Sequence, residues 1–142
     1  MIFVKVNQIM TTDVSTVAPN DTITKAASLM EQLNVGSVPV ADNNRIVGII
    51  TDRDIVLRGV AKGQGANLKV SEVMTPDVKY ATPDMDVHTV ADIMAENQVR
   101  RLPVVDHEKL VGIVAIGDLA VENMFENEAG EALHTISQGV RH

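Results

Sequence analysis

The chain contains a long internal repeat. Residues 6–55 align with residues 70–119 at a constant offset of 64 positions without a gap, and 16 of the 50 aligned pairs are identical. Self-similarity on this scale indicates that one supersecondary unit occurs twice. A unit of about 50 residues is only marginally stable alone, because it buries a small fraction of its surface. The repeat therefore predicts two pseudo-symmetric units that pack against each other along their sheets.

Each repeat has the pattern strand, helix, strand, strand, helix. A short apolar segment ends near a proline, Pro19 or Pro83. Thr22 or Asp86 then provides a good N-cap for a helix whose apolar residues recur at helical spacing. The fold class predicted from this pattern is α/β, of the α+β type. The paired strands are expected at 38–41 and 46–50 in the first repeat and at 102–105 and 110–114 in the second.

The same pattern predicts the domain organisation. The expected segments are a first repeat at 1–60, a polar connector at 61–69, a second repeat at 70–122 and a helical tail at 123–142. Val121, Met124 and Phe125 share an apolar helical stripe that leads into the tail. The last residues, 137–142, are expected to be frayed.

The stretch Val47–Ile55 carries the clearest chemical signal. An apolar run ends at Thr51 and a charged segment follows at once, which predicts a strand passing directly into a helix. Gly48 lies inside this strand, where a glycine permits close approach of another backbone or of a ligand. Thr51 and Asp54 are three residues apart and face the mouth of the helix. Two interpretations remain open: a Thr-x-x-Asp capping box, or a site where helix N–H groups bind an anion such as phosphate.

The second repeat departs from the first at this stretch. Ala115 stands where the first repeat has Thr51, so no hydroxyl can cap the helix, whereas the acid is retained as Asp118. A capping box accounts for Asp118 less well than for Asp54, although any carboxylate in a first helical turn gains from the helix dipole. The retained acid therefore favours a second role, as acceptor for a pair of ligand hydroxyls.

Composition excludes several functions. The net charge of −7 argues against an electrostatic grip on DNA or on an anionic membrane. Aromatic residues make up 2% of the chain, so platforms for stacking nucleic-acid bases are missing. There is no cysteine, which excludes disulfides and thiolate catalysis and fits a cytoplasmic protein. Neither a signal peptide nor a membrane-spanning run is evident in the sequence.

The motifs of both repeats resemble a tandem pair of CBS domains, a Bateman module. The first repeat carries Met10-Thr11-x-Asp13-Val14, Asn34 to Val40 and Gly48 to Asp54, and the second carries Met74 to Val78, Val99 to Asp106 and Gly112 to Asp118. The resemblance covers residues 5 to about 122. The run from Thr51 to Gly59 is similar to that of bacterial stand-alone CBS-pair proteins of the hypoxic-response type.

The resemblance implies an adenosine-containing ligand in clefts between the two repeats. AMP or ATP is the expected ligand, with ADP, S-adenosylmethionine and NAD as further members of the class. Asp54 and Asp118 are implied as ribose acceptors, which suits an ionised carboxylate, and Thr51 as a phosphate contact. The segments implied to sandwich the adenine are Thr16, Val17 and Ala18 in the first repeat and Tyr80, Ala81 and Thr82 in the second, with Pro39 and Pro103 nearby.

Arg100 and Arg101 form the best cationic element, because arginine can fork onto phosphate oxygens. The alternative is a solvated pair of surface arginines. The first repeat has Gly36-Ser37 at these positions, so the two sites cannot be equivalent. Arg53 supplies charge to the first site, or else forms an exposed salt bridge with Asp52 or Asp54.

The sequence thus predicts a regulatory nucleotide-binding module that is not an enzyme, requires no cofactor and forms a homodimer. No catalytic residues are assigned, and no metal is expected, because the four histidines show no metal-ligand spacing. No DNA or membrane partner is expected, and the protein target is not identified. The alternative is a dimerising interaction scaffold with no small-molecule ligand.

Overall fold

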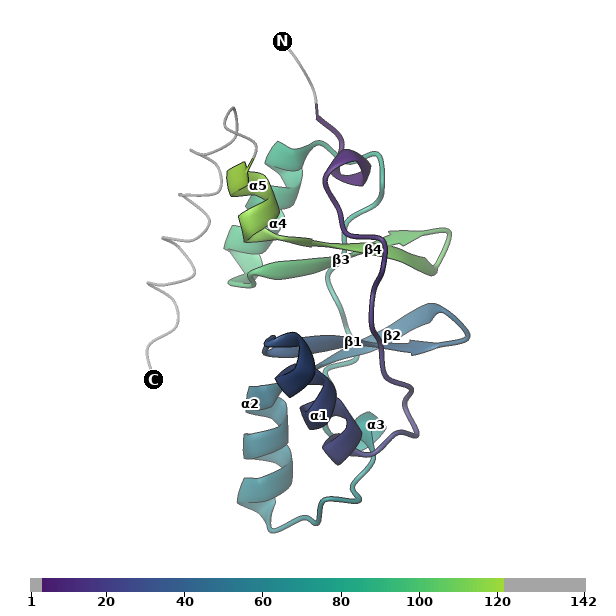
Figure 1. Ribbon diagram of the computed structural model, residues 1–142, viewed down its shortest axis with the longest axis vertical. Helices are drawn as coiled ribbons and strands as arrows, with labels where there is room; N and C mark the ends of the chain where they lie inside the picture. Colours follow the sequence, from purple (N-terminus) through teal and green to yellow (C-terminus); the bar gives the residue numbers. More distant parts are fainter. Residues whose placement is uncertain (1–3, 122–142) are drawn as a thin grey trace. The chain divides into compact units, whose positions relative to one another are not determined.

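The computed structural model describes residues 4–121, and these form two compact units. The central unit comprises residues 15–78, and the terminal unit combines residues 4–14 with residues 79–121. The predicted tail at 123–142, with Met124 and Phe125, lies outside the described residues. Figure 1 shows the elements of both units along the chain.

Each unit is built on an antiparallel hairpin. In the central unit β1 (Ser37–Asp42) pairs with β2 (Arg45–Thr51), and in the terminal unit β3 (Arg101–Asp106) pairs with β4 (Lys109–Ala115). Ser37 lies opposite Thr51, and Arg101 lies opposite Ala115. The tight turns place Asn43, Asn44, His107 and Glu108 at positive φ, as two-residue hairpins require. The four predicted strands of the hairpins are therefore confirmed.

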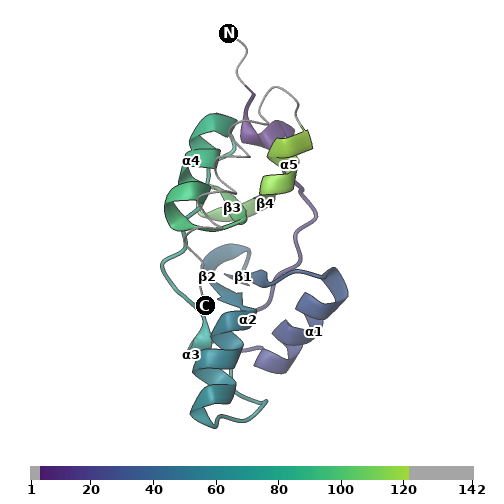
Figure 2. The same ribbon diagram turned by 90° about the vertical axis from the view of Figure 1, so that its left-hand side faces the viewer.

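Helices cover one side of each hairpin (Figures 1 and 2). α1 (Ile23–Leu33) begins at Thr22, whose hydroxyl accepts from the Lys25 N–H, and α4 (Val87–Asn97) begins at Asp86, whose carboxylate accepts from the His88 N–H. Both predicted N-caps are confirmed. The central unit adds the helical run α2 (Asp52–Asp54), η2 (Ile55–Gly59) and η3 (Val60–Lys62), of which η2 is a π-helix. The terminal unit adds α5 (Ile116–Val121).

The apolar segments predicted ahead of α1 and α4 form only single β bridges. The Val17 N–H donates to the Pro39 carbonyl at 3.2 Å, and the Val17 carbonyl accepts from the Ala41 N–H at 2.9 Å. Ala81 forms the matching pair with Pro103 and Val105. Pairing extends no further because a proline follows two residues later and cannot donate to a ladder.

The two repeats exchange their first segments. α3 (Val70–Val73) opens the second repeat, yet Val70 and Val73 are buried in the core of the central unit. η1 (Val6–Gln8) opens the first repeat, yet Val6 is buried in the core of the terminal unit. The compact units therefore have different boundaries from the sequence repeats.

Two glycines allow the Met-Thr segments, Met10-Thr11 and Met74-Thr75, to pack closely against the strands β4 and β2. A Cβ at Gly48 would lie 2.7 Å from Met74 Sδ and 2.9 Å from the Thr75 carbonyl oxygen, and Gly112 meets Met10 and Thr11 in the same way. Thr75 and Ile49 exchange two backbone hydrogen bonds, both of 2.9 Å. Of the two roles considered for Gly48, the structure supports the approach of another backbone.

We expect Gly48→Ala to lower the free energy of unfolding by about 1–3 kcal/mol, the usual cost of overpacking a filled site. Urea unfolding followed by circular dichroism measures the change. Gly65→Ala is the matched control, because no atom lies within 4 Å of a Cβ there and its φ is not positive. Equal stability of the two variants would contradict the close approach.

Candidate functional site

The predicted strand-to-helix junction of the central unit is a complete capping box. The Thr51 N–H donates to Asp54 Oδ2 and the Asp54 N–H donates to Thr51 Oγ1, each at 3.0 Å. This geometry confirms the interpretation of the motif as a capping box. It does not use all the hydrogen-bonding capacity of either side chain. Thr51 Oγ1 acts as an acceptor here and keeps its own hydrogen as a donor, and Asp54 keeps a second oxygen.

Half of the same box is present in the terminal unit. The Ala115 N–H donates to Asp118 Oδ2 at 2.7 Å. The expectation that loss of the threonine weakens the capping role of Asp118 is therefore corrected. The aspartate accepts from a backbone N–H, which alanine supplies as well as threonine does. In both units a half-buried aspartate has one oxygen held by the end of the second strand.

The other predicted site residues of the central unit lie near this junction. Val17 contacts the main chain of β1 at Pro39 and Ala41. Pro39 is two residues along β1 from Ser37, the partner of Thr51, a separation of roughly 7 Å. Thr16 is half-buried and Ala18 is exposed, whereas Val17 and Pro39 are buried. The structure thus places the start of β1 between the Thr16–Ala18 segment and Thr51.

The terminal unit repeats this arrangement. Ala81 contacts β3 at Pro103 and Val105, and Ala115 lies opposite Arg101. Ala81 and Pro103 are buried, Thr82 is half-buried, and Tyr80 is exposed. The Thr82 hydroxyl donates to Asp84 at 3.0 Å.

Main-chain groups in these segments are largely used within the protein. Both peptide groups of Val17 and of Ala81 bond to the adjacent strand. The Ala18 N–H donates to Asp21 Oδ2 at 2.8 Å, and this hydrogen bond is the main cause that lowers the pKa of the Asp21 carboxyl. A base lying against these segments would therefore meet exposed atoms of Thr16, Ala18, Tyr80 and Thr82 rather than the peptide groups of the central residues.

The arginines predicted from sequence lie in different surroundings. Arg100 and Arg53 are exposed, and the Arg100 carbonyl accepts from the Ile116 N–H at 2.8 Å. Arg101 is half-buried: burial lowers its pKa, and the attraction of the Asp118 carboxylate opposes that change. Arg101 is therefore the predicted cation that faces a predicted ribose acid.

Sequence reasoning missed the cation beside Asp54. Arg58 Nε lies 3.9 Å from Asp54 Oδ1, and Arg58 Nη1 donates to the Val73 and Met74 carbonyls at 3.4 and 3.3 Å. The spacing of four residues on a predicted helix was the available signal. Each aspartate thus has an arginine, which comes from η2 in the central unit and from β3 in the terminal unit.

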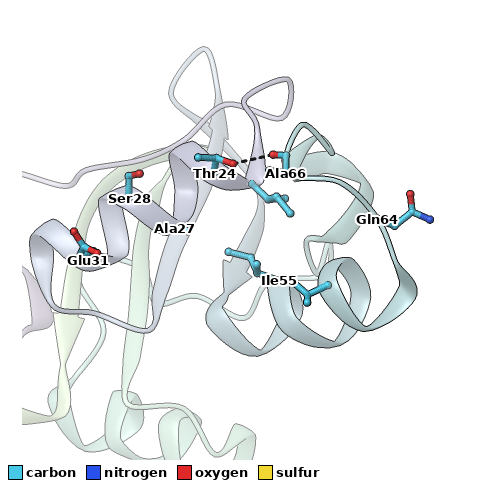
Figure 3. A pocket seen from close by; sticks show the side chains of 9 residues that line it. Thr24, Ala27, Ser28, Glu31, Ile55, Gln64 and Ala66 are labelled. Atoms are coloured by element: carbon cyan, nitrogen blue, oxygen red, sulfur yellow. Dashed lines mark hydrogen bonds between the residues drawn. The ribbon is translucent and has the colours of Figure 1, made fainter.

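A separate groove lies between α1 and the α2–η3 run of the central unit (Figure 3). Its volume is about 340 Å³, and the Thr24 hydroxyl donates across its wall to the Ala66 carbonyl at 2.9 Å. Ile23, Ala27, Ile55 and Val60 make its apolar surface, while Ser28, Glu31 and Gln64 lie among its polar lining residues. None of the site residues predicted from sequence lines this groove.

The described residues contain neither a candidate metal site nor a membrane-spanning helix. Within residues 4–121, no three His, Cys, Asp or Glu side chains gather into a possible metal site. No helix in the same range is both long enough and apolar enough to cross a membrane.

Comparison with known proteins identifies the family. The CBS domain model matches residues 6–60 and residues 70–122. The chain therefore belongs to the CBS-domain family and carries two copies of the domain. It is 50% identical over 132 residues to CBS domain-containing protein YhcV of Bacillus subtilis strain 168, an alignment that covers 93% of this chain and 94% of that protein.

Solved structures confirm the predicted class and fold. Hypoxic Response Protein I, crystallised with two coordinated zinc ions, gives a TM-score of 0.78 at 34% identity over 84% of this chain and 98% of that chain. The CBS domain pair of protein MJ0100, in complex with 5-methylthioadenosine and S-adenosyl-L-methionine, gives 0.74 at 29% identity over 89% and 99%. A hexameric CBS-CP12 protein from bloom-forming cyanobacteria gives 0.72 at 27% identity over 86% and 69%.

The two aspartate variants Asp54→Ala and Asp54→Asn should differ in stability. The alanine variant leaves the Thr51 N–H without its partner and should lose about 1 kcal/mol, as loss of a cap does. Asparagine keeps a side-chain oxygen that can accept the same hydrogen bond, so Asp54→Asn should lose clearly less. Thermal and urea unfolding of both variants measure the difference, and equal losses would show that this side-chain hydrogen bond does not stabilise the protein.

Proposed function

We propose that the chain is a regulatory module that binds adenosine-containing ligands, AMP or ATP above all, at sites that include Asp54 and Asp118. The observation that carries this proposal is the pair of half-buried aspartates, each held through one oxygen by a backbone N–H. A held carboxylate is preorganised to accept from the two hydroxyls of a ribose with its remaining lone pairs. The adenosine ligands of the MJ0100 domain pair support the ligand class.

The two sites are proposed to be unequal. The central-unit site offers Asp54 together with the Thr51 hydroxyl, whereas the terminal-unit site offers Asp118 with Arg101 and no hydroxyl at position 115. The adenine is proposed to lie near Thr16 and Ala18, or near Tyr80 and Thr82. We assign no catalytic role and no required cofactor to the chain, and we place its function in the cytoplasm.

Calorimetric titration of the wild type with AMP, ATP, S-adenosylmethionine and NAD tests the proposal. At least one ligand should bind, and Asp54→Asn should weaken it roughly 10- to 150-fold, because a hydrogen bond to a charged group contributes about 1.5–3 kcal/mol. Asp118→Asn should weaken binding less. Equal losses in the two variants would contradict the asymmetry, and no binding by the wild type at millimolar ligand would favour a scaffold.

The scaffold remains the second candidate function, and a specific observation favours it. Both aspartates already have a structural role as caps. In addition, η2 and η3 expose Val56 at 53%, Leu57 at 44% and Val60 at 64%. A cluster of exposed apolar side chains on one helical run is typical of a protein interface. This reading requires oligomerisation and no small-molecule ligand.

Both candidate functions include a homodimer, for which we propose that Val56, Leu57 and Val60 form part of the contact. Leu119, an apolar residue of α5 in the second repeat, is fully buried in the terminal unit and is therefore not part of this contact. The side chain of Val121 and residue Met124 lie outside the described part of the chain.

Light scattering at tens of micromolar should give the mass of two chains, about 31 kDa from a chain of 15.3 kDa. Val56→Asp combined with Val60→Asp should halve that mass, because two carboxylates would be buried unpaired in the contact. Lys62→Asp, a substitution at another exposed position at the end of η3, is the control. A single-chain mass for the wild type would rule out the dimer.

A further inference from the structure

Arg58 joins two parts of the central unit that are distant in sequence. Its Nε lies 3.9 Å from Asp54 Oδ1, and its Nη1 donates to the carbonyls of Val73 and Met74 at 3.4 and 3.3 Å. One planar guanidinium therefore spans the proposed ribose acid and the end of α3. A guanidinium has five N–H donors in a fixed fork, so both sets of contacts are compatible.

The local structure explains why the carbonyls are available. α3 is four residues long, and the last carbonyls of a helix have no partner within the helix. A basic side chain near a helix C-terminus can hydrogen-bond such carbonyls and also interacts favourably with the helix dipole. Arg58 itself lies in the π-helical turn η2, directly before Gly59, which is buried against Ile23.

The same segment is anchored to β2 close to the capping box. Thr75 exchanges two backbone hydrogen bonds of 2.9 Å with Ile49, two residues before Thr51. Arg58 therefore connects Asp54 with the carbonyls of Val73 and Met74. The next residue, Thr75, is hydrogen-bonded to Ile49 on β2, the strand that ends at the capping box. A change at Asp54 has a direct physical route to residues 73–75.

In the second repeat, the residue equivalent to Arg58 cannot make these contacts. The position 64 residues after Arg58 is Glu122, which has no N–H donor on its side chain. Asp118 interacts instead with Arg101, which belongs to the strand β3. The contacts that Arg58 makes with the aspartate and the exchanged segment are therefore not repeated by the equivalent residue of the second repeat.

We infer that Arg58 is a positioning residue for the Asp54 site and that it transmits ligand occupancy to residues 73–75. The inference rests on the proposed function. Ribose hydroxyls that donate to Asp54 Oδ1 hold the carboxylate in one orientation, and the carboxylate in turn holds the guanidinium of Arg58 beside it. The guanidinium then bonds more fully to the Val73 and Met74 carbonyls, which holds this segment more firmly on β2.

Hydrogen exchange read by mass spectrometry tests this transmission in the full chain. The ligand that binds the wild type in calorimetry, starting with AMP, should slow exchange in a peptide that covers Met74 and Thr75. Arg58→Gln should abolish that slowing and weaken binding about 2- to 5-fold, the size expected of a partly exposed ion pair. Arg58→Lys should restore the affinity, because it keeps the charge, but not the slowing, because an ammonium lacks the fork.

Lys62→Gln is the matched control, since it removes one exposed positive charge from the same helical run. It should keep both the affinity and the slowing of exchange. If the ligand binds the wild type and Arg58→Gln behaves as Lys62→Gln does, the inference is overturned while the proposed function stands. If no ligand binds the wild type, the proposed function fails and the inference fails with it.

Discussion

The rest of the structure depends on the close packing of each Met-Thr segment against a glycine. This glycine lies on the second strand of each hairpin, β2 or β4. Gly48 and Gly112 admit sulfur and carbonyl atoms at distances that no Cβ would tolerate. Thr75 bonds to Ile49, and Thr11 bonds to Ile113, through paired backbone hydrogen bonds of 2.8–2.9 Å. These contacts bring the first segment of one repeat into the unit formed by the other and complete both cores.

The Met-Thr segments also bear on the candidate sites. Ile49 lies two residues before Thr51, and Ile113 lies two residues before Ala115, so each strand is held just ahead of its junction with a helix. The junction then orients an aspartate through one oxygen and leaves the other outside the cap. Structural capping and ligand binding are therefore compatible roles for the same carboxylate, because a carboxylate accepts more hydrogen bonds than the cap uses.

Much of this architecture follows from patterns of neighbouring residues. Alternating apolar segments and turn residues predicted both hairpins, and Thr22 and Asp86 predicted the helix starts, because these signals are local. The exchange of first segments was not predictable in this way. Two similar repeats offer nearly the same apolar surface to residues 6–14 and 70–78, so the pattern does not say which unit each segment joins.

The sequence predicted which residues belong to the candidate sites, but it predicted fewer of the contacts that these residues make. The aspartates and Thr51 were found from the motif, whereas the hydrogen bond from Ala115 to Asp118 depends on a backbone N–H, which leaves no trace in residue identity. Arg58 was missed because its partners at Val73 and Met74 are carbonyls distant in sequence. The π-helical turn that carries Arg58 has no clear sequence signature either.

The central claim is that an adenosine-containing ligand binds at the capped aspartates. An NMR titration of the ¹⁵N-labelled protein with AMP tests this most directly, because it locates the ligand. The account predicts saturable shifts of the amide signals of Thr16, Thr51 and Asp54, with smaller ones at Ala115 and Asp118. Shifts confined to the lining of the helical groove, at Thr24, Ser28 and Gln64, would contradict it, as would the absence of any shift.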